Sequence, residues 1–355
     1  MTKQENRYEI GSEFHWPGVP HGPYLSWPEP HRMFASGREA LLCVWRILQN
    51  NNINTLFVPD YFCHEVVTWW GQQGVIIRRY VDGPHMTSPV WKSLTASQGD
   101  SVLAVNYFGV RDENIWGKWK NANKEVLLIE DHSHDPLSDW AYYSQADYAF
   151  ASLRKTFPVP DGAILWAPKG LPLPDEPSKG DWSGSALKLA AMVLKKDYLE
   201  GAGEHVKDVF RDLQERGESM YGEADASAVS PWSRFLLALG YPVIWREQRE
   251  KNVKTLLRLI FTHRSIQPLF TEWPDHNCPF NAVLLFASKE CRDQCRSRLI
   301  SAGIYPSVHW ELSSSATSGA LALSTRILTI PVDQRYDDED MKYIASILSK
   351  CSDYD

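Results

Sequence analysis

Three residues combine a reactive side chain or backbone with a suggestive position in the chain: Gly37, Asp131 and Lys155. Gly37 opens a helical pattern, and the free N–H groups of a helix N-terminus attract phosphate. Asp131 ends the apolar run VLLIED, where a buried carboxylate needs a cation or a good donor, such as a protonated pyridine nitrogen. Lys155 stands among apolar residues, and a desolvated lysine is a nucleophile that forms Schiff bases with aldehydes.

Each of these residues also has an ordinary structural interpretation. A glycine such as Gly37 is more often part of a plain helix cap, and a lysine in the string SLRK is more often on the protein surface, whereas Asp131 is equally typical of a carboxylate that caps the next helix. Ser152, three residues before Lys155, offers a hydroxyl to the same phosphate, and Arg154 offers a charge unless it faces solvent. Taken singly, these residues leave both interpretations open.

The surrounding pattern predicts elements that would position these residues. Residues 36–51 have apolar side chains at spacings of three and four, which indicates a helix opened by a Ser-Gly cap. Short apolar runs then alternate with helical stretches from residue 54 to residue 153, which is typical of a mainly parallel sheet with crossover helices. Ligands of open α/β sheets lie beyond the carboxyl ends of the strands, so the polar residues there are the candidates.

The rest of the chain predicts an arm, a loop and a second, smaller domain. Residues 1–30 hold five prolines and are expected to form an extended arm. Residues 167–185 are rich in Pro, Gly and Ser, as in a surface loop, and residues 186–222 and 233–260 have helical patterns. The strand-like 281–288 and 326–332 flank a helical segment and predict a small α+β domain.

Composition excludes several classes of protein. The 355 residues carry a formal net charge of −7 with no dense Lys/Arg stretch, so neither nucleic acid nor an anionic membrane is an expected partner. The six cysteines are scattered, which indicates neither a metal site nor a disulfide framework. No signal-like or membrane-spanning apolar run is present, so a cytoplasmic location is expected.

Several strings resemble, in order and approximate spacing, the DegT/StrS family of aminotransferases. They are SGREAL, FVPDYFCHEV, VNYFG, LLIEDHSHD, SLRKTFPVPDG, REQREKN, GIYPSVHW and ILTIPVDQRY. The resemblance covers most of the chain, from about Met33 to about Tyr336. It implies an α/β fold-type-I transferase dependent on pyridoxal 5′-phosphate (PLP), with an arm (1–30), a large cofactor domain (31–245) and a small C-terminal domain (246–355).

The same resemblance implies roles for individual residues. Lys155 would hold PLP as a Schiff base and move the proton between substrate and cofactor, while Asp131 would hold the pyridine nitrogen. The residues expected at the phosphate are Ser36, Gly37, Arg38 and Ser152.

Other positions depart from the family pattern or match it only in part. Arg38 replaces a small residue, and Cys63 stands where many members stack an aromatic ring on the cofactor, with Phe62 and His64 as alternatives. His132 and Ser133 replace small residues beside the ring. His134 matches a frequent family histidine, with a structural role as the alternative. The candidate substrate contacts are Tyr107, His309, Trp310, Arg326 and Arg335.

The implied activity is transamination by a homodimer. An amino-acid donor would leave its nitrogen on the cofactor, and a keto acceptor, a nucleotide sugar or another biosynthetic intermediate, would take it. The same cofactor also supports elimination, decarboxylation and oxidation, and an inactive scaffold protein is the remaining alternative.

Overall fold

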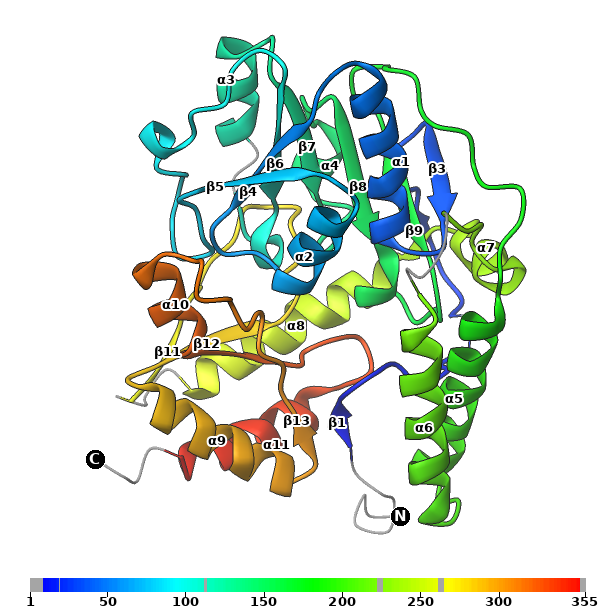
Figure 1. Cartoon of the computed structure of the whole chain (residues 1–355). Coiled ribbons are helices and arrows are strands. Elements are labelled where there is room, and N and C mark those ends of the chain that lie inside the picture. Colours follow the sequence, from blue (N-terminus) through cyan, green and yellow to red (C-terminus); the bar gives the residue numbers. More distant parts are fainter. Residues whose placement is uncertain (1–8, 19, 112–113, 222–225, 261–264, 352–355) are drawn as a thin grey trace.

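A seven-stranded sheet forms the centre of the larger part of the molecule (Figure 1). The computed structural model describes residues 9–18, 20–111, 114–221, 226–260 and 265–351. The strand order is β3-β9-β8-β7-β6-β4-β5. The strands are β3 (His31–Phe34), β4 (Thr55–Pro59), β5 (Ile76–Tyr80), β6 (Asp100–Val105), β7 (Leu127–Asp131), β8 (Tyr148–Ser152) and β9 (Ala163–Trp166).

The sheet is mainly parallel, as the sequence predicts. Strands β4 to β8 pair in parallel, whereas β9 runs antiparallel to β8 and β3 antiparallel to β9. Helices cover both faces, so the inner strands are apolar on both sides and lack strict alternation. In β7, Ile129 packs toward the core beside α1 (Gly37–Asn50) and α2 (His64–Gln72), and Leu128 toward the core beside α3 (Asn114–Ala122) and α4 (Asp139–Tyr142).

The two long helical patterns after residue 185 each divide into two helices. The first forms a hairpin of α5 (Ser183–Leu199) and α6 (His205–Ser219), broken by a glycine-containing turn. The second forms α7 (Pro231–Leu237) and α8 (Val243–Ile260), joined through Gly240 and β10 (Tyr241–Pro242). Gly240 has a φ of +87°, and a Cβ there would lie 2.4 Å from the Leu25 carbonyl oxygen. Only glycine fits this turn without strain.

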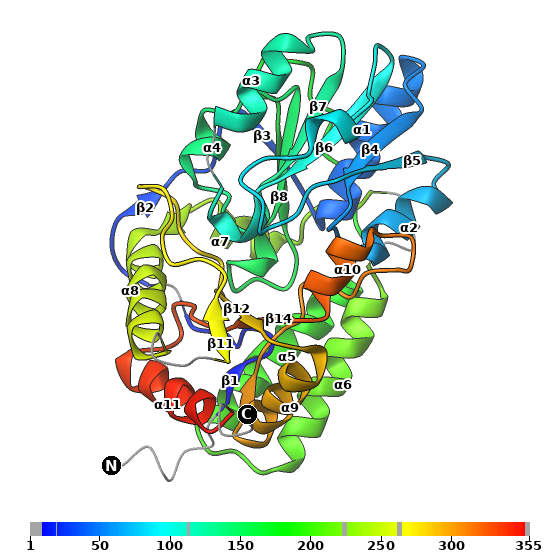
Figure 2. The same ribbon diagram turned by 90° about the vertical axis from the view of Figure 1, so that its left-hand side faces the viewer.

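A small antiparallel sheet forms the C-terminal part, beneath the central sheet and next to α8 (Figure 2). Its strands, in spatial order, are β11 (Ile266–Pro268), β12 (Ala282–Phe286) and β14 (Ile327–Ile330). Three helices and a short strand complete this part: α9 (Lys289–Ser301), β13 (Ile304–Tyr305), α10 (Ser318–Ser324) and α11 (Asp338–Ser349). One apolar cluster joins the sheet to α8, α9 and α11, which gives this part its own core.

The N-terminal segment packs on the rest of the chain through two short strands. β1 (Ile10–Gly11) pairs with β13 of the small sheet region, and β2 (Tyr24–Leu25) pairs with β10. The predicted start of the small domain, at residue 246, falls within helix α8. Among the described residues, no helix is long and apolar enough to span a membrane.

Candidate active site

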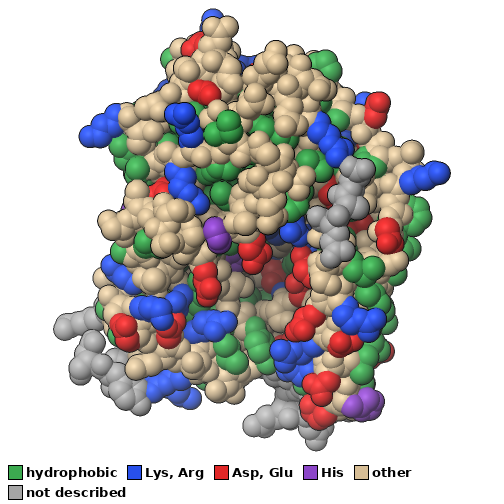
Figure 3. Space-filling view, viewed as in Figure 1, with side chains coloured by type: hydrophobic (Ala, Val, Ile, Leu, Met, Phe, Trp, Pro, Cys, Tyr) green, Lys and Arg blue, Asp and Glu red, His purple; other side chains and the backbone are tan. Residues whose placement is uncertain are grey.

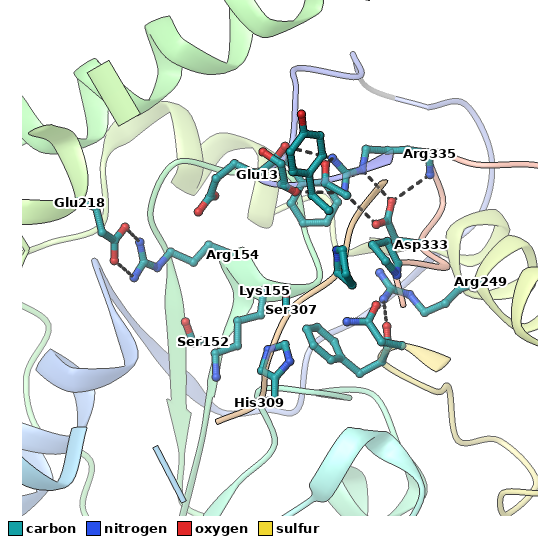
Figure 4. A pocket seen from close by; sticks show the side chains of 18 of the residues that line it. Glu13, Ser152, Arg154, Lys155, Glu218, Arg249, Ser307, His309, Asp333 and Arg335 are labelled. Carbon is teal, nitrogen blue, oxygen red and sulfur yellow. Dashed lines mark hydrogen bonds and ion pairs between the residues drawn. The ribbon is translucent and has the colours of Figure 1, made fainter. Parts of the chain in front are cut away.

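Lys155 lies in a cavity between the two sheets. Strand β8 ends at Ser152, and a short 3-10 turn (Leu153–Lys155) carries the lysine past the carboxyl end of the sheet. The cavity has a volume of about 450 Å³, and residues of the sheet end, the N-terminal segment, the α5–α6 hairpin and the small domain line it. Figure 3 shows this face hollowed at its middle, and Figure 4 shows Lys155 inside the cavity, close to Ser152 and His309. This is the edge where ligands of open α/β sheets bind.

The start of α1 touches Ser152. The Ser36 hydroxyl accepts the Glu39 N–H, which leaves the first N–H groups of the helix, those of Gly37 and Arg38, without an intrahelical acceptor. A Cβ on Gly37 would lie 3.3 Å from the Cβ of Ser152. The helix N-terminus therefore approaches the serine so closely because residue 37 has no side chain. Free N–H groups beside a hydroxyl make an anion site.

Hydrogen bonds connect Asp131 to the same serine. One oxygen of the buried Asp131 carboxylate accepts the Ser133 N–H at 2.8 Å. The Ser133 hydroxyl accepts the Ser152 N–H at 2.9 Å. The second carboxylate oxygen has no donor among the described residues. A buried carboxylate with one free oxygen can accept a hydrogen bond from a ligand.

His134 is buried between aromatic rings with one nitrogen unsatisfied. Its ring stacks on Phe280, with centroids 4.4 Å apart and planes at 7°. Its Nδ1 accepts the Phe108 N–H at 3.0 Å, so the proton of the neutral ring is on Nε2. That buried Nε2 has no partner among the described residues. Burial first, and then the charges of Lys155 and His309, lower the pKa of His134 well below its ordinary value, so the ring stays neutral.

His309 and Trp310 surround the lysine. The Lys155 Nζ lies 5.9 Å from the centre of the Trp310 ring. The Thr329 hydroxyl donates to the Ser307 carbonyl, so it accepts from His309 Nδ1 at 2.9 Å, and His309 Nε2 is left as an acceptor. Burial and then the charge of Lys155 lower the pKa of His309 to about 3.

Charged groups form the outer walls of the cavity. Arg154 makes a two-pronged ion pair with Glu218, at 2.5 and 2.8 Å, and Lys188 contacts the same carboxylate at 2.5 Å. Burial lowers the pKa of Arg154, but the hydrogen bonds and charge of Glu218 raise it above its ordinary value. On the opposite wall, Arg335 pairs with Asp333 at 2.7 Å. The first wall has two cations for one carboxylate and is net positive.

Comparison with solved structures identifies the fold. A proposed sugar aminotransferase from Streptococcus pneumoniae in its PLP form superposes with a TM-score of 0.64 over 92% of this chain and 87% of that one, at 15% sequence identity. A DegT/DnrJ/EryC1/StrS aminotransferase from Brucella abortus gives 0.59 over 92% and 87%, at 13% identity. 3-Amino-5-hydroxybenzoic acid synthase gives 0.61 over 91% and 86%, at 14% identity.

The chain has the DegT/StrS aminotransferase fold. No family model and no curated protein matches it by sequence. The fold-type-I architecture expected from the sequence is therefore confirmed, while the low identities leave the roles of its residues to be argued from the site itself.

The residues present fit the PLP expected of the DegT/StrS fold. The Gly37 helix start and Ser152 would hold its phosphate in a space that a Cβ at residue 37 would crowd. The unsatisfied Nε2–H of His134 is a donor in need of an acceptor, such as the phenolic oxygen of the cofactor. The free oxygen of Asp131 suits a protonated ring nitrogen, and Lys155 would supply the amine.

Some residues predicted from the sequence lie away from the cavity of this DegT/StrS fold. The Tyr107 hydroxyl donates to the Tyr61 carbonyl and its side chain is fully buried. Arg326 donates through Nε to the Phe286 carbonyl on the small sheet, and neither it nor Tyr107 lines the cavity. Arg335 does line it, but the guanidinium is used by Asp333 and by backbone carbonyls of the N-terminal segment.

The three residues that were candidates for stacking on the cofactor ring lie in different surroundings. Phe62 packs against Trp310 and Trp70, Cys63 precedes the first residue of α2, and His64 is exposed and contacts Thr68. An aromatic ring does lie near Lys155, but it belongs to Trp310, a residue expected from the sequence to contact the substrate.

Several residues that line the cavity were not predicted from the sequence. Glu13, Lys188, Glu218 and Asn281 come from four distant segments. None belongs to a motif with the lysine, and no local pattern marks them. The sequence did single out the charge of Arg154, because this residue directly precedes the candidate lysine and lies in the same turn.

Proposed function

We propose that this protein is a PLP-dependent aminotransferase that moves an amino group from an amino-acid donor to a keto acceptor. The observation that carries the proposal is the position of Lys155 in a cavity lined by Ser152 and the neutral His309, with the Gly37 helix start against Ser152 and the neutral His134 next to His309. The DegT/StrS fold supports it, because aminotransferases are among the solved structures that share this fold.

The chain's own residues would hold the cofactor at four points. The N–H groups of Gly37 and Arg38 and the Ser152 hydroxyl would bind its phosphate. Asp131 would accept from the ring nitrogen, and His134 Nε2 would donate to the ring oxygen. Bound there, PLP supplies an aldehyde carbon that exchanges amines and a ring that accepts electrons from the substrate.

Lys155 would move the proton of the reaction. Its free Nζ would take the proton from the substrate carbon and return it one position away. His309 has its Nε2 available as an acceptor and stays neutral above about pH 3, so it adds no positive charge beside Nζ. A neutral neighbour helps the lysine to act as a base, because a second cation would disfavour its protonation.

Arg154 and Lys188 would bind the donor carboxylate. They share the single carboxylate of Glu218, and Arg154 is the residue next to the reactive lysine. Glu218 takes one hydrogen bond from each terminal nitrogen of Arg154, so a donor carboxylate would bind the remaining N–H groups of Arg154 and Lys188, attracted by the net positive charge of this wall. Arg335 lacks this capacity, since Asp333 and three backbone carbonyls occupy its donors.

The experiment is a set of half-reactions with the purified, PLP-loaded protein. Each of the common amino acids is added in turn, and the visible absorption band and the products are followed. Transamination predicts that one donor class removes the band and releases one equivalent of keto acid per site, with neither carbon dioxide nor ammonia. The Lys155→Ala variant should release none. Continuous release of carbon dioxide or ammonia by the wild-type protein would assign another PLP reaction.

We also propose that the protein is a homodimer. Large apolar side chains are exposed where α7 leads into α8: Phe235 at 67%, Ile244 at 53% and Leu239 at 41%. An exposed apolar group of this kind is typical of an interface. Light scattering should give twice the chain mass for the wild type and a smaller mass for Phe235→Glu, and a monomeric wild type would refute the dimer.

A further inference from the structure

The N-terminal segment from Glu9 to Phe14, called the strap below, forms one wall of the cavity. Ile10 and Gly11 pair with β13, and the Gly11 N–H donates to the Tyr336 hydroxyl at 2.7 Å. Lys195 of the α5–α6 hairpin donates to the carbonyls of Gly11 and Glu13, at 3.3 and 2.8 Å. The strap thus connects the hairpin to the small domain across the cavity.

Further contacts fix the strap in this position. The Glu9 carboxylate is buried and pairs with Lys195 at 2.9 Å and Lys207 at 3.0 Å. Arg335 donates to the Glu13 carbonyl at 3.0 Å, and its guanidinium lies 4.4 Å from the centre of the Phe14 ring. Gly11 lies directly against β13, where a Cβ would lie 2.4 Å from the Tyr305 carbonyl oxygen, so only glycine allows this close approach.

Two side chains of the strap remain exposed, those of Ser12 and Glu13, and both residues line the cavity. Figure 4 shows Glu13 in the same cavity as Lys155 and Arg154. The cations around it have other partners: Arg154 and Lys188 pair with Glu218, and Arg335 pairs with Asp333. Within the part of the chain that the structure describes, no ion pair of the Glu13 carboxylate is formed.

The Glu13 carboxylate forms no ion pair of its own among the described residues, although its charge acts on Arg154 and Arg335, and it changes which substrates the cavity accepts. It repels a second negative charge on the substrate and attracts a group that donates hydrogen bonds or carries positive charge. The backbone of Glu13 is held by Lys195 and Arg335, so the side chain cannot leave the cavity wall by a movement of the strap alone. Discrimination by a repulsive element is a common source of specificity.

We infer that Glu13 is a specificity residue, which selects against substrates with a second carboxylate or a phosphate distal to the reacting carbon and favours neutral or cationic distal groups. The inference rests on the proposed transamination, since it concerns the substrate that reaches Lys155. It assigns the selection to the N-terminal strap, a segment outside the sheet that carries the lysine.

The first test compares Glu13→Gln with the wild type in the half-reaction, with glutamate and glutamine as donors. The amide keeps the shape of the side chain and removes its charge. The ratio of the rate constants, glutamate over glutamine, should rise by about fivefold, as expected for loss of one repulsion across a partly hydrated cavity. Glu13→Asp should keep the wild-type preference. Glu272→Gln, which removes an exposed charge outside the cavity lining, should leave the ratio unchanged.

The second test does not need catalysis. Glutarate has two carboxylates and no amine, and its binding to wild type and Glu13→Gln is measured by calorimetry. Glu13→Gln should bind it about fivefold more tightly, with Glu272→Gln like the wild type. An equal affinity in wild type and Glu13→Gln, or an unchanged donor ratio, would overturn the inference. Failure of the proposed function is a different result: a protein that acquires no visible absorption band with PLP, whatever the residue at position 13.

Discussion

The rings of His134 and His309 lie 5.8 Å apart at 80°, and their hydrogen bonds fix opposite tautomers. His134 receives the Phe108 N–H on Nδ1 and keeps its own proton on Nε2, whereas His309 donates from Nδ1 to Thr329. The surroundings of Lys155 thus contain one imidazole donor, His134, and one imidazole acceptor, His309, of which His309 lines the cavity. Because burial keeps both rings uncharged, neither adds a positive charge beside Lys155.

The donor nitrogen of His134 should contribute to cofactor binding. His134→Phe keeps a flat ring against Phe280 and removes the Nε2–H. We expect the PLP dissociation constant to rise about tenfold, the effect of one hydrogen bond to a partly charged oxygen. Absorbance titration measures it. His64→Phe is the matched control, because the exposed His64 lies on the surface of α2 and should not affect PLP affinity. Equal loss in both variants would contradict this assignment.

Gly37 should be needed for the phosphate cradle more than for the fold. In Gly37→Ala the new Cβ meets the Ser152 Cβ at 3.3 Å, which separates the helix start from the hydroxyl. We expect PLP affinity to fall about tenfold, the equivalent of one lost hydrogen bond, while the protein remains folded.

Gly71→Ala is the control for this substitution. Gly71 lies in α2 with nothing within 4 Å of an added Cβ, so alanine should raise the free energy of unfolding by about 0.5 kcal/mol and leave PLP affinity unchanged. Unaltered PLP affinity in Gly37→Ala would show that the phosphate lies elsewhere.

Arg154 should act on the donor and leave the cofactor untouched. Arg154→Lys keeps the charge but loses the two-pronged contact with Glu218 and the remaining guanidinium N–H groups that would receive a substrate carboxylate. We expect kcat/KM for the amino donor to fall about tenfold, with PLP affinity unchanged. Arg326→Lys, on the small sheet and outside the cavity lining, should behave as the wild type. If the two variants lose the same activity, Arg154 has no special role.

Stability should fall in mild acid because of the buried histidines. An unfolded histidine takes up a proton below about pH 6.5, whereas folded His309 does so only near pH 3. The unfolded state therefore binds more protons between these values. The His309 contribution to stability is complete above about pH 6.5 and declines as the pH falls toward 3, by about 1.4 kcal/mol per pH unit.

Urea unfolding at a series of pH values measures this slope. His309→Gln should have a shallower decline between pH 6 and pH 4 than the wild type, and His64→Gln, at an exposed position, should have the same decline. A slope in His309→Gln that equals the wild-type slope would mean that this histidine titrates normally in the folded protein.

The sequence was most informative where burial controls residue type. The inner strands β4, β6, β7 and β8 are covered on both faces, so each forms a continuous apolar run that predicts a parallel sheet. Strand β3 begins with His31 and Arg32, half-buried at the sheet edge, and its weak pattern gave no prediction.

The residues of the candidate site likewise fall into a predictable group and an unpredictable one. Lys155, Asp131 and Ser152 lie just past or at strand ends, where the α/β rule directs attention. Glu13 and Lys188 reach the cavity through the packing of the strap and the hairpin. Such contacts depend on how distant segments of the chain pack together, and the spacing of residues in the sequence does not predict that packing. The surface position of His64 likewise follows from the rotation of α2 about its axis.

The central claim is that Lys155 carries the cofactor. The most direct measurement is borohydride reduction of the PLP-treated protein, followed by digestion and mass spectrometry of the peptides. The reduced cofactor should be found on the peptide that contains Lys155, and Lys155→Ala should carry none while keeping its fold by circular dichroism. A label on another lysine, or no label in a folded wild-type protein saturated with PLP, would contradict the claim.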